Sequence, residues 1–399
     1  MIKSINLKNY IETLESGKRP KGGASNSGVP SLGAEHINLN GGFNLQIDKL
    51  KFVPEEYFNS LSKGIIKKND ILIVKDGATT GKVAYVNEDF PLEKACINEH
   101  VFLVRPKKEI NPKYLFYYFF SNIGQREILK DFRGATVGGI SKEFIDIDMY
   151  IPKVDEQIQI IKILDKAKSL IDKRKEQIKT LDELVKSKFI EMFGEPFSNT
   201  KGWEKQPLNK LVTDDCTISY GIVQTGEEQR EGIPVFRPVD IVNNRKPKLE
   251  ELKKTTEEIS NKYKKTILQG NELLMTVRAN IGDVCVIDEE FKGCNVGRGI
   301  VPIRVKEEIN PIFLKYQFES YRIQHELKAL SKGITLIQLN MEDLRQFMLI
   351  VPPIELQNQF ADFVNQVDKL KFEMEKSLKE LEDNFNSLMQ KAFKGELFN

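Results

Sequence analysis

The apolar residues of two long segments, 153–196 and 353–399, recur at alternating steps of three and four positions. The positions between them carry mainly Lys, Glu, Gln and Asp. An apolar stripe with this spacing, kept over several heptads, predicts a coiled-coil helix in each segment. Arg174, Lys188 and Lys371 interrupt the stripes. The predicted seam residues are Leu164, Ile171, Ile178, Leu181, Val185, Val364, Val367, Met374, Leu378, Leu381, Phe385 and Leu388.

The segments before these helices, 1–152 and 197–352, contain short apolar runs separated by glycines and prolines. Runs such as Ile71–Val74 are typical of strands. Asn111-Pro112 and Asn310-Pro311 each precede an apolar, aromatic stretch, and this order predicts a capped helix start. We therefore predict an α+β protein, in which two mixed, β-rich domains are joined by two long antiparallel coiled-coil helices.

The chain repeats itself with a period of about 200 residues. Three pairs of segments match in the same order: 69–86 with 270–287, 109–119 with 308–318, and 150–160 with 350–360. A repeat unit of this size can fold alone. The organisation is therefore a domain at 1–152, a helix at 153–196, a second domain at 197–352 and a second helix at 353–399.

The two apolar stripes lie in the same register on separate helices. Packing the helices on each other buries both stripes, and an antiparallel arrangement relates the two repeats by a pseudo-two-fold axis. Duplex DNA has local two-fold axes that symmetric DNA-binding proteins use. The helix pair therefore suits a protein with two sites on one duplex.

Charge and cysteine content narrow the possible functions. The 60 Lys and Arg nearly balance the 58 Asp and Glu, so any DNA binding must rely on local basic patches or on a partner. The four cysteines form no Cys-x-x-Cys pair, which argues against zinc sites and a disulfide framework. No apolar run reaches membrane-spanning length, and residues 1–10 lack the layout of a signal peptide, so we expect a cytoplasmic protein without membrane contact.

Catalytic motifs are weak throughout the chain. Gly77–Lys82 resembles a phosphate-binding loop but is one residue too short, and Val83 stands where Ser or Thr is required. Asn111-Pro112-Lys113-Tyr114 lacks the second proline of an adenine-methyltransferase motif, and no Gly-x-Gly-x-x-Gly loop follows a strand. We therefore expect a protein that is not an enzyme; a standalone enzyme with an unrecognised site is one alternative.

The order of segments resembles the specificity subunit of type I restriction–modification enzymes. Two junctions between domain and helix, Ile151–Ala167 and Val351–Val364, are similar to those of the family. The ends of both helices and two segments of the first domain are similar as well: Lys186–Pro196, Leu388–Leu397, Asp76–Val86 and Gly134–Ser141. The resemblance covers essentially the whole chain.

The resemblance implies that each domain recognises one half of a bipartite site in double-stranded DNA. It also implies that the helices set the gap between the halves and dock two methyltransferase (modification) subunits, to which restriction/translocase subunits add. S-adenosylmethionine, ATP and Mg²⁺ are then expected in the partner subunits and no cofactor or metal in this chain. The alternative is a coiled-coil scaffold that binds proteins rather than DNA.

Base recognition requires side chains that reach groove edges, together with phosphate anchors. We expect both in three loop regions of each domain, where a solvated loop or a plain hairpin turn is the alternative. In order, the regions are Ser16–Gly23, the turn at Lys75–Lys82 and Lys130–Lys142 in the first domain, and Thr217–Gln224, the turn at Arg278–Asn280 and Lys332–Asn340 in the second. The candidates in the first domain are Lys18, Arg19, Lys21, Lys75, Thr79, Thr80, Lys82, Arg133, Thr136 and Lys142. The candidates in the second domain are Ser219, Tyr220, Gln224, Arg237, Arg278, Asn280, Lys332, Thr335 and Gln338.

These loops differ more between the repeats than the predicted framework does, so we expect an asymmetric target with two different half-sites. His36 and Arg237 align just after the first predicted strand of each repeat. A buried core histidine is the favoured interpretation of His36.

Overall fold

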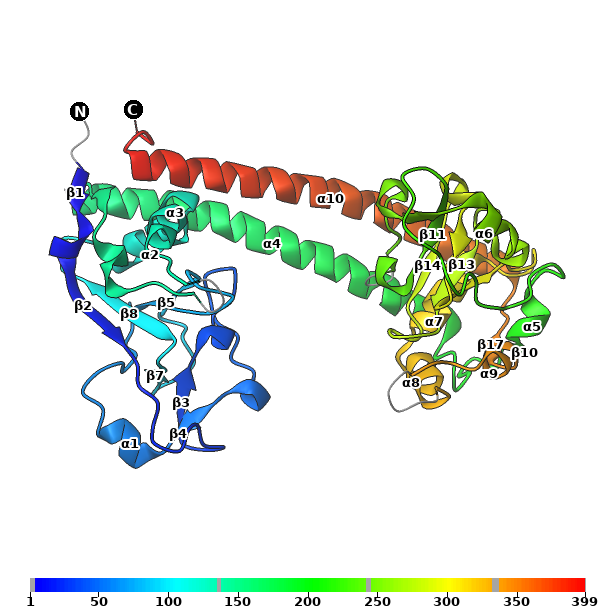
Figure 1. Cartoon of the computed structure of the whole chain (residues 1–399), viewed down its shortest axis with the longest axis horizontal. Helices are drawn as coiled ribbons and strands as arrows, with labels where there is room; N and C mark the ends of the chain where they lie inside the picture. The colour runs from blue at the N-terminus through cyan, green and yellow to red at the C-terminus, as the bar shows by residue number, and fades with distance from the viewer. Residues whose placement is uncertain (1–3, 135–137, 242–244, 332–336, 399) are drawn as a thin grey trace. The chain divides into compact units, whose positions relative to one another are not determined.

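A computed structural model describes residues 4–134, 138–241, 245–331 and 337–398. The chain forms two compact units (Figure 1). Unit 1 contains Met1–Glu176 and Glu375–Asn399, and unit 2 contains Gln177–Met374. The two long helices, α4 (Val154–Phe193) and α10 (Ile354–Lys394), lie within the predicted helical segments, and each gives one half to each unit.

Unit 1 contains a four-stranded antiparallel sheet in the order β2-β8-β5-β6 and a three-stranded sheet in the order β4-β3-β7. Strands β1 and β9 form a further antiparallel pair. The strands are β1 (Ser4–Asn6), β2 (Ile11–Ser16), β3 (Val29–Leu32), β4 (Phe52–Val53), β5 (Ile71–Val74), β6 (Val83–Tyr85), β7 (Cys96–Ile97), β8 (Val101–Pro106) and β9 (Asp148–Tyr150). The helices before α4 are α1 (Glu55–Asn59), α2 (Pro112–Phe120) and α3 (Asn122–Lys130).

Unit 2 repeats most of this arrangement, with sheets ordered β14-β13-β16 and β12-β11-β15 and with the pair β10-β17, but among the described residues its first sheet has no counterpart of β2. The strands are β10 (Lys205–Pro207), β11 (Ile233–Phe236), β12 (Lys253–Thr255), β13 (Leu273–Thr276), β14 (Val284–Val286), β15 (Asn295–Val296), β16 (Ile300–Ile303) and β17 (Met348–Ile350). The helices before α10 are α5 (Leu208–Leu211), α6 (Glu257–Asn261), α7 (Pro311–Glu319), α8 (Tyr321–Ala329) and α9 (Met341–Arg345). The predicted mixed α and β composition is confirmed.

The Asn-Pro pairs begin helices as predicted. The side chain of Asn111 accepts a hydrogen bond from the Lys113 amide, at 2.9 Å, at the start of α2. Asn310 does the same for the Ile312 amide at the start of α7, also at 2.9 Å. In both helices the residue that follows is proline, which needs no amide partner in the first turn.

A buried glutamine connects each long helix to the start of a shorter helix, α4 to α2 in unit 1 and α10 to α7 in unit 2. The Gln157 amide donates to the carbonyl oxygens of Glu109 and Pro152, both at 2.9 Å, and accepts from the Asn111 amide at 2.7 Å. Gln357 makes the corresponding bonds to Glu308, Pro352 and Asn310 at 3.1, 2.7 and 2.9 Å. Both glutamines have 0% exposed surface, so these bonds satisfy groups that water cannot reach.

The two long helices pair antiparallel within each unit, which confirms the predicted helix pairing. In unit 1, Lys175 Nζ lies 2.7 Å from Glu382 Oε1. In unit 2, Asp182 pairs with Lys371, and further along α4 the ring of Phe189 packs edge-to-face on Phe360 at 5.4 Å. Residues later in α4 therefore contact residues earlier in α10, as two antiparallel helices do.

The predicted seam residues are buried or half-buried. Seven of them are buried: Leu164, Ile171, Leu181, Val185, Val364, Val367 and Phe385. Five are half-buried: Ile178, Met374, Leu378, Leu381 and Leu388. Of the residues that interrupt the stripes, Lys371 avoids an unpaired charge in the helix pair by bonding Asp182.

Aromatic side chains join the helix pair to each domain. In unit 1 the ring of Phe393 packs on Tyr114 at 5.3 Å and on Tyr118 at 5.4 Å. In unit 2 the ring of Phe313 packs on Phe193 at 4.7 Å and on Phe189 at 5.7 Å. Each half helix is thus part of a domain core, which explains why the compact units cut across the helices.

The structure corrects the ungapped alignment of the repeat. Asn69 and Asn271 share a positive φ, 69° and 66°, just before equivalent strands, which gives an offset of 202. Val83 and Val284 begin the next strands with an offset of 201, so the second turn is one residue shorter. Arg278 consequently corresponds to Asp76, since these residues form equivalent bridges to Gln338 and Gly139.

The pairing of His36 with Arg237 was also wrong. Gly33 donates its amide to His36 Nδ1 at 2.8 Å, and Arg237 donates its amide to Asp240 Oδ2 at 2.7 Å. Arg237 therefore corresponds to Gly33, and His36 to Asp240. His36 is 1% exposed and hydrogen-bonded, as the core interpretation requires.

Among the described residues, no helix is long and apolar enough to cross a membrane. All four cysteines are free thiols, and burial raises the pKa of Cys294 to about 11 and that of Cys285 to about 12.

Candidate nucleic-acid interface

The backbone brings the second and third predicted loop regions of unit 1 together. The Ile140 amide donates to the Lys75 carbonyl at 2.8 Å, and the Gly77 amide donates to the Gly138 carbonyl at 3.0 Å. The turn between β5 and β6 therefore lies against the segment that follows α3.

Side chains connect the first loop region to the same place. Arg19 Nε lies 2.8 Å from Glu99 Oε1, and that oxygen lies 3.4 Å from His100 Nε2. His100 Nδ1 lies 2.5 Å from Asp76 Oδ1, in the turn after β5. We call Arg19, Asp76, Glu99 and His100 the first corner.

Unit 2 forms an equivalent corner from the same backbone contacts. The Leu339 amide donates to the Val277 carbonyl at 3.0 Å, and the Arg278 guanidinium donates to the Gln338 amide oxygen. The Ile222 amide donates to the Val296 carbonyl at 2.8 Å, which brings the first loop region beside Arg298. We call Arg278, Arg298 and Gln338 the second corner.

Many of the other predicted residues are at least partly exposed near the corners. Lys18, Lys21, Tyr220, Gln224 and Asn280 are exposed, and Lys75, Thr79, Thr80, Lys82 and Ser219 are half-buried. The Thr80 hydroxyl donates to the Gly77 carbonyl at 2.7 Å and so stabilises the turn itself. Three predicted residues, Thr136, Lys332 and Thr335, lie outside the described residues.

Three more of the predicted residues, outside the two corners, bond to other parts of the protein. Lys142 donates to the Leu14 carbonyl at 3.0 Å, and Arg133 pairs with Asp131 at 3.1 Å. The Arg237 guanidinium makes two hydrogen bonds to Asp240, at 2.6 and 3.0 Å, and this carboxylate raises the pKa of Arg237. These side chains therefore already have a partner within the protein.

The sequence analysis missed four of the corner residues: Asp76, Glu99, His100 and Arg298. Glu99-His100 and Arg298-Gly299 immediately precede equivalent strands, β8 and β16, at an offset of 199. Charged residues at one position of both repeats, next to a strand that pairs with the predicted turn, were the available signal. Strand pairing, which the sequence does not reveal, was needed to connect them to the turn.

A glutamine on α3 or α8 holds each turn in place. Gln125 donates to the carbonyls of Gly81 and Phe119 at 2.9 and 2.7 Å. Gln324 donates to the carbonyls of Gly282 and Phe318 at 2.7 and 2.9 Å. Both turns are thereby attached to a helix, which limits the movement of the corner residues.

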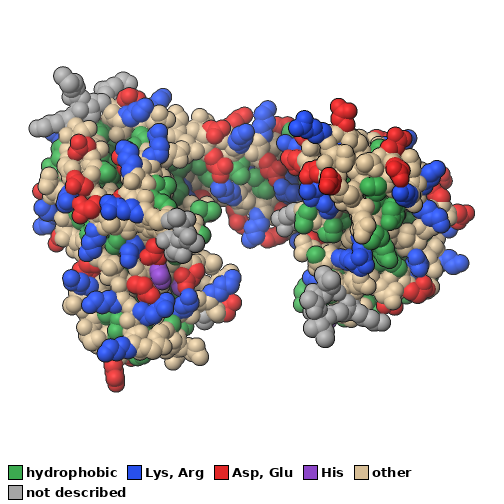
Figure 2. Space-filling view, in the orientation of Figure 1, with side chains coloured by type: hydrophobic (Ala, Val, Ile, Leu, Met, Phe, Trp, Pro, Cys, Tyr) green, Lys and Arg blue, Asp and Glu red, His purple; other side chains and the backbone are tan. Residues whose placement is uncertain are grey.

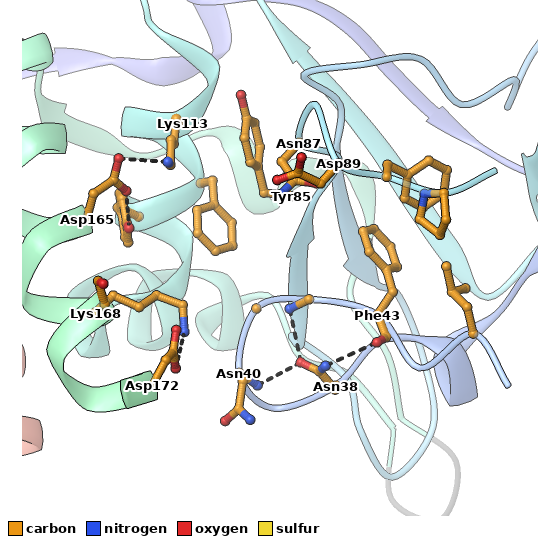
Figure 3. A pocket seen from close by; sticks show the side chains of 18 of the residues that line it. Asn38, Asn40, Phe43, Tyr85, Asn87, Asp89, Lys113, Asp165, Lys168 and Asp172 are labelled. Atoms are coloured by element: carbon orange, nitrogen blue, oxygen red, sulfur yellow. Dashed lines mark hydrogen bonds and ion pairs between the residues drawn. The ribbon is translucent and has the colours of Figure 1, made fainter. Parts of the chain in front are cut away.

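A cavity of about 930 Å³ lies in unit 1 between α4, α2 and the loops around Asn38 and Asn87 (Figure 3). Lys113 of α2 points to Asp165 of α4, with 2.7 Å between Nζ and Oδ2, and Lys168 points to Asp172 at 3.5 Å. Tyr85 lies at the cavity, and burial raises its pKa to about 12. The cavity therefore combines aromatic side chains with charges that are already paired.

A second cavity, of about 580 Å³, lies in unit 2 beside the other half of α4. Ile190 and Tyr321 line it and expose 47% and 84% of their surfaces. Burial raises the pKa of its Glu319 carboxyl above the usual range, with Lys315 acting in the opposite direction at 3.6 Å. This cavity also combines apolar surface with charges that are already paired.

Charges of both signs are interspersed over the visible face of each unit (Figure 2). This agrees with the net charge of +2 and leaves no broad basic surface in that view. Among the described residues, no group of three or more His, Cys, Asp and Glu is placed to hold a metal ion. If the chain binds DNA, the attraction must come from local basic patches or from a partner.

These features define a class of protein with two repeated, loop-bearing domains attached to a helix pair. Residues 7–181 and 216–383 match the model of the type I restriction modification DNA specificity domain. The chain belongs to this family, whose general role is DNA recognition.

Relatives agree with this assignment over most of the chain. The type I restriction enzyme EcoBI specificity subunit of Escherichia coli is 23% identical over 86% of this chain and 76% of its own length. The putative type I restriction enzyme MjaX specificity subunit of Methanocaldococcus jannaschii is 25% identical over 98% of this chain and 92% of its own length.

A solved structure supports the fold. One chain from a study of complex assembly and conformational transition of the type I R-M system is similar to this protein. The match covers 99% of this chain and 98% of the solved chain. The TM-score is 0.64 at 17% sequence identity.

Proposed function

We propose that this protein is the specificity subunit of a type I restriction–modification complex and that each unit binds one half of a bipartite site in double-stranded DNA. The observation that carries the proposal is the convergence of three loop regions at an equivalent corner in each unit. The framework of the corners repeats, whereas their side chains differ. Two different half-sites, and hence an asymmetric target, follow from that difference.

The proposal assigns the docking of two modification subunits to the helix pair and the cavities beside it. Support comes from apolar side chains on the helices that the helix pair leaves exposed: Val154, Ile158 and Leu170 in unit 1, and Leu184, Ile190, Leu370 and Phe372 in unit 2. Phe372 is 66% exposed. Exposed apolar side chains of this size are typical of surfaces that a partner covers.

The proposal also assigns catalysis and cofactors to the partners. In a complex with modification and restriction/translocase subunits, S-adenosylmethionine, ATP and Mg²⁺ would bind to those subunits. Support comes from the buried cysteines, whose raised pKa values make them poor nucleophiles. The weakness of the phosphate-loop and methyltransferase motifs supports the same assignment.

The test is to co-express the chain with its modification subunit and to map methylated adenines by single-molecule sequencing. We expect one bipartite motif that disappears when this chain is omitted. The same motif made by the modification subunit alone would overturn the proposal. Absence of any motif, with an assembled complex, would favour the coiled-coil scaffold, which near-neutral charge and the exposed helix residues also allow. DNA methylation by this chain alone with S-adenosylmethionine would instead establish an enzyme.

The role of the helices in setting the gap has its own test. Insertion of one heptad between Ile171 and Val185, matched by one in α10, lengthens each helix by about 10 Å. We expect the gap in the methylated motif to grow by about three base pairs while both half-sites remain. An unchanged gap would show that the helices do not set the spacing.

A further inference from the structure

Backbone hydrogen bonds make the two corners equivalent residue by residue. The Lys75 amide donates to the His100 carbonyl and the Val277 amide to the Gly299 carbonyl, both at 2.8 Å. His100 therefore corresponds to Gly299, and the preceding Glu99 corresponds to Arg298. Asp76 is equivalent to Arg278 in the same way. Two carboxylates of the first corner are therefore replaced by two guanidinium groups in the second.

The first loop region shows the complementary change. A Cβ at Gly17 would lie 1.9 Å from the Ile97 carbonyl oxygen, and a Cβ at Gly221 would lie 1.8 Å from the Val296 carbonyl oxygen. These two glycines are therefore equivalent. Two residues further on, Arg19 corresponds to Val223. Glu99 has Arg19 as a basic partner in unit 1, whereas the residue of unit 2 that corresponds to Arg19 is the apolar Val223.

The first corner presents hydrogen-bond acceptors. The side chains of Asp76 and Glu99 expose 27% and 31% of their surfaces. Glu99 Oε2 has no hydrogen-bond partner within the described part of the chain and is itself buried. A buried carboxylate oxygen without a partner is costly, and a donor brought by a ligand would remove that cost.

The second corner presents donors. Arg298 is exposed, and its side chain makes no ion pair or hydrogen bond with another residue in the part of the chain that the structure describes. Gly299 allows the close approach of its neighbours, because a Cβ there would lie 2.3 Å from Pro238 Cγ and 3.5 Å from Arg278 Cβ. A side chain at this position would clash with Pro238, so the second corner has no counterpart of the His100 side chain.

We propose that the two corners recognise opposite hydrogen-bonding edges of DNA bases. Arg278 and Arg298 donate to the O6 and N7 acceptors of guanine, and Asp76 and Glu99 accept from the exocyclic amino group of cytosine or adenine. The inference rests on the proposed function, because it needs DNA at both corners.

The test uses the complex of the full chain with its modification subunit and a library of randomised DNA duplexes. For Arg298→Ala we expect a loss of preference for guanine of about 10-fold or more at one position of one half-site, with the other half-site unchanged. Arg298→Lys keeps the charge but not the paired donors, and we expect it to weaken the same preference. For Glu99→Gln we expect a changed base preference only in the opposite half-site. Lys292→Ala removes an exposed charge outside the corner and serves as the matched control.

The outcomes separate the two proposals. A bipartite motif selected by the original complex, but left intact in both half-sites by Arg298→Ala and Glu99→Gln, would overturn the inference and leave the proposed function standing. A uniform loss of affinity for all sequences in Arg298→Ala, restored by lysine, would show a phosphate contact and overturn it as well. A complex that selects no motif would overturn the proposed function and the inference together.

Discussion

The frameworks of units 1 and 2 agree closely, whereas their corners carry opposite charges. Gln157 and Gln357 bond equivalent carbonyls, and Gln125 and Gln324 hold equivalent turns. At the corners, by contrast, acids stand where the other unit has arginines. Buried polar groups must keep their partners after a duplication, because the alternative is an unsatisfied hydrogen bond. Exposed loop residues have no such constraint and are able to diverge.

A buried ion pair shows an intermediate case. Arg105 donates to Asp70 at 2.6 and 2.8 Å in unit 1. Arg304 is shared in unit 2 between buried Glu272, at 3.0 Å, and exposed Asp215, at 2.6 Å. Both units thus have an arginine paired with a buried carboxylate, but in unit 2 the arginine also contacts a carboxylate that is exposed to water. Burial raises the pKa of Asp70 despite Arg105, whereas the Thr213 hydroxyl and Arg304 lower the pKa of Asp215.

The largest effect is expected from a charge in the helix pair. Leu164→Asp in unit 1 and Val364→Asp in unit 2 place an unpaired carboxylate at equivalent buried positions. Each should reduce the free energy of unfolding by several kcal/mol, because the charge is desolvated. Urea unfolding followed by circular dichroism measures this, with the exposed position Lys166→Asp as control. A large effect in one unit only would show that the helix pair is not equivalent in the two units.

The next effect concerns the glutamines at the helix starts. Gln157→Ala and Gln357→Ala each remove three hydrogen bonds, of which the one to the proline carbonyl is buried and the other two are partly buried. We expect each to lower the free energy of unfolding by about 2–4 kcal/mol. Chemical denaturation tests this, and Gln390→Ala, on the exposed face of α10, is the control. A decrease in the free energy of unfolding no larger than that of the control would contradict a structural role for Gln157 and Gln357.

A smaller and more local effect is expected at the turns. Gln125→Ala and Gln324→Ala remove two hydrogen bonds each, for about 1–2 kcal/mol. Hydrogen exchange of the Gly81 amide should accelerate only in the first variant and that of Gly282 only in the second. If either variant affected both amides, the units would not respond independently.

The smallest effect separates the two ion pairs by pH. The lowered pKa of Asp215 means that its ionised form stabilises the fold above about pH 4, and this contribution is lost as the pH falls through the lowered value. Asp215→Asn should therefore cost less than about 1 kcal/mol at neutral pH, since the group is largely exposed, and nothing near pH 2. The raised pKa of Asp70 has the opposite sign, so its contribution to stability decreases as the pH rises above about 4. Unfolding curves at several pH values compare the two, and a constant deficit in Asp215→Asn would contradict the assignment.

The local and periodic features of this protein followed from its sequence alone. Heptad spacing is set by helix geometry, so both long helices were predictable. The Asn-Pro helix starts and the domain-sized repeat were predictable for similar reasons, because capping and repetition act over neighbouring residues or over the whole chain. The three loop regions of the candidate site were also identified.

The composition of each corner was decided only by the tertiary structure. Glu99 joins Arg19, and Arg298 lies beside the loop of Ile222, because strands distant in sequence pair with each other. Because one turn is a residue shorter than the other, Arg278 is the structural equivalent of Asp76, and an alignment without a gap in this turn could not detect that equivalence. The sequence also could not show that Asp240 engages Arg237, since that bond depends on a loop conformation. Side-chain chemistry is local, but the neighbours of a side chain depend on strand register, and register is a property of the folded chain.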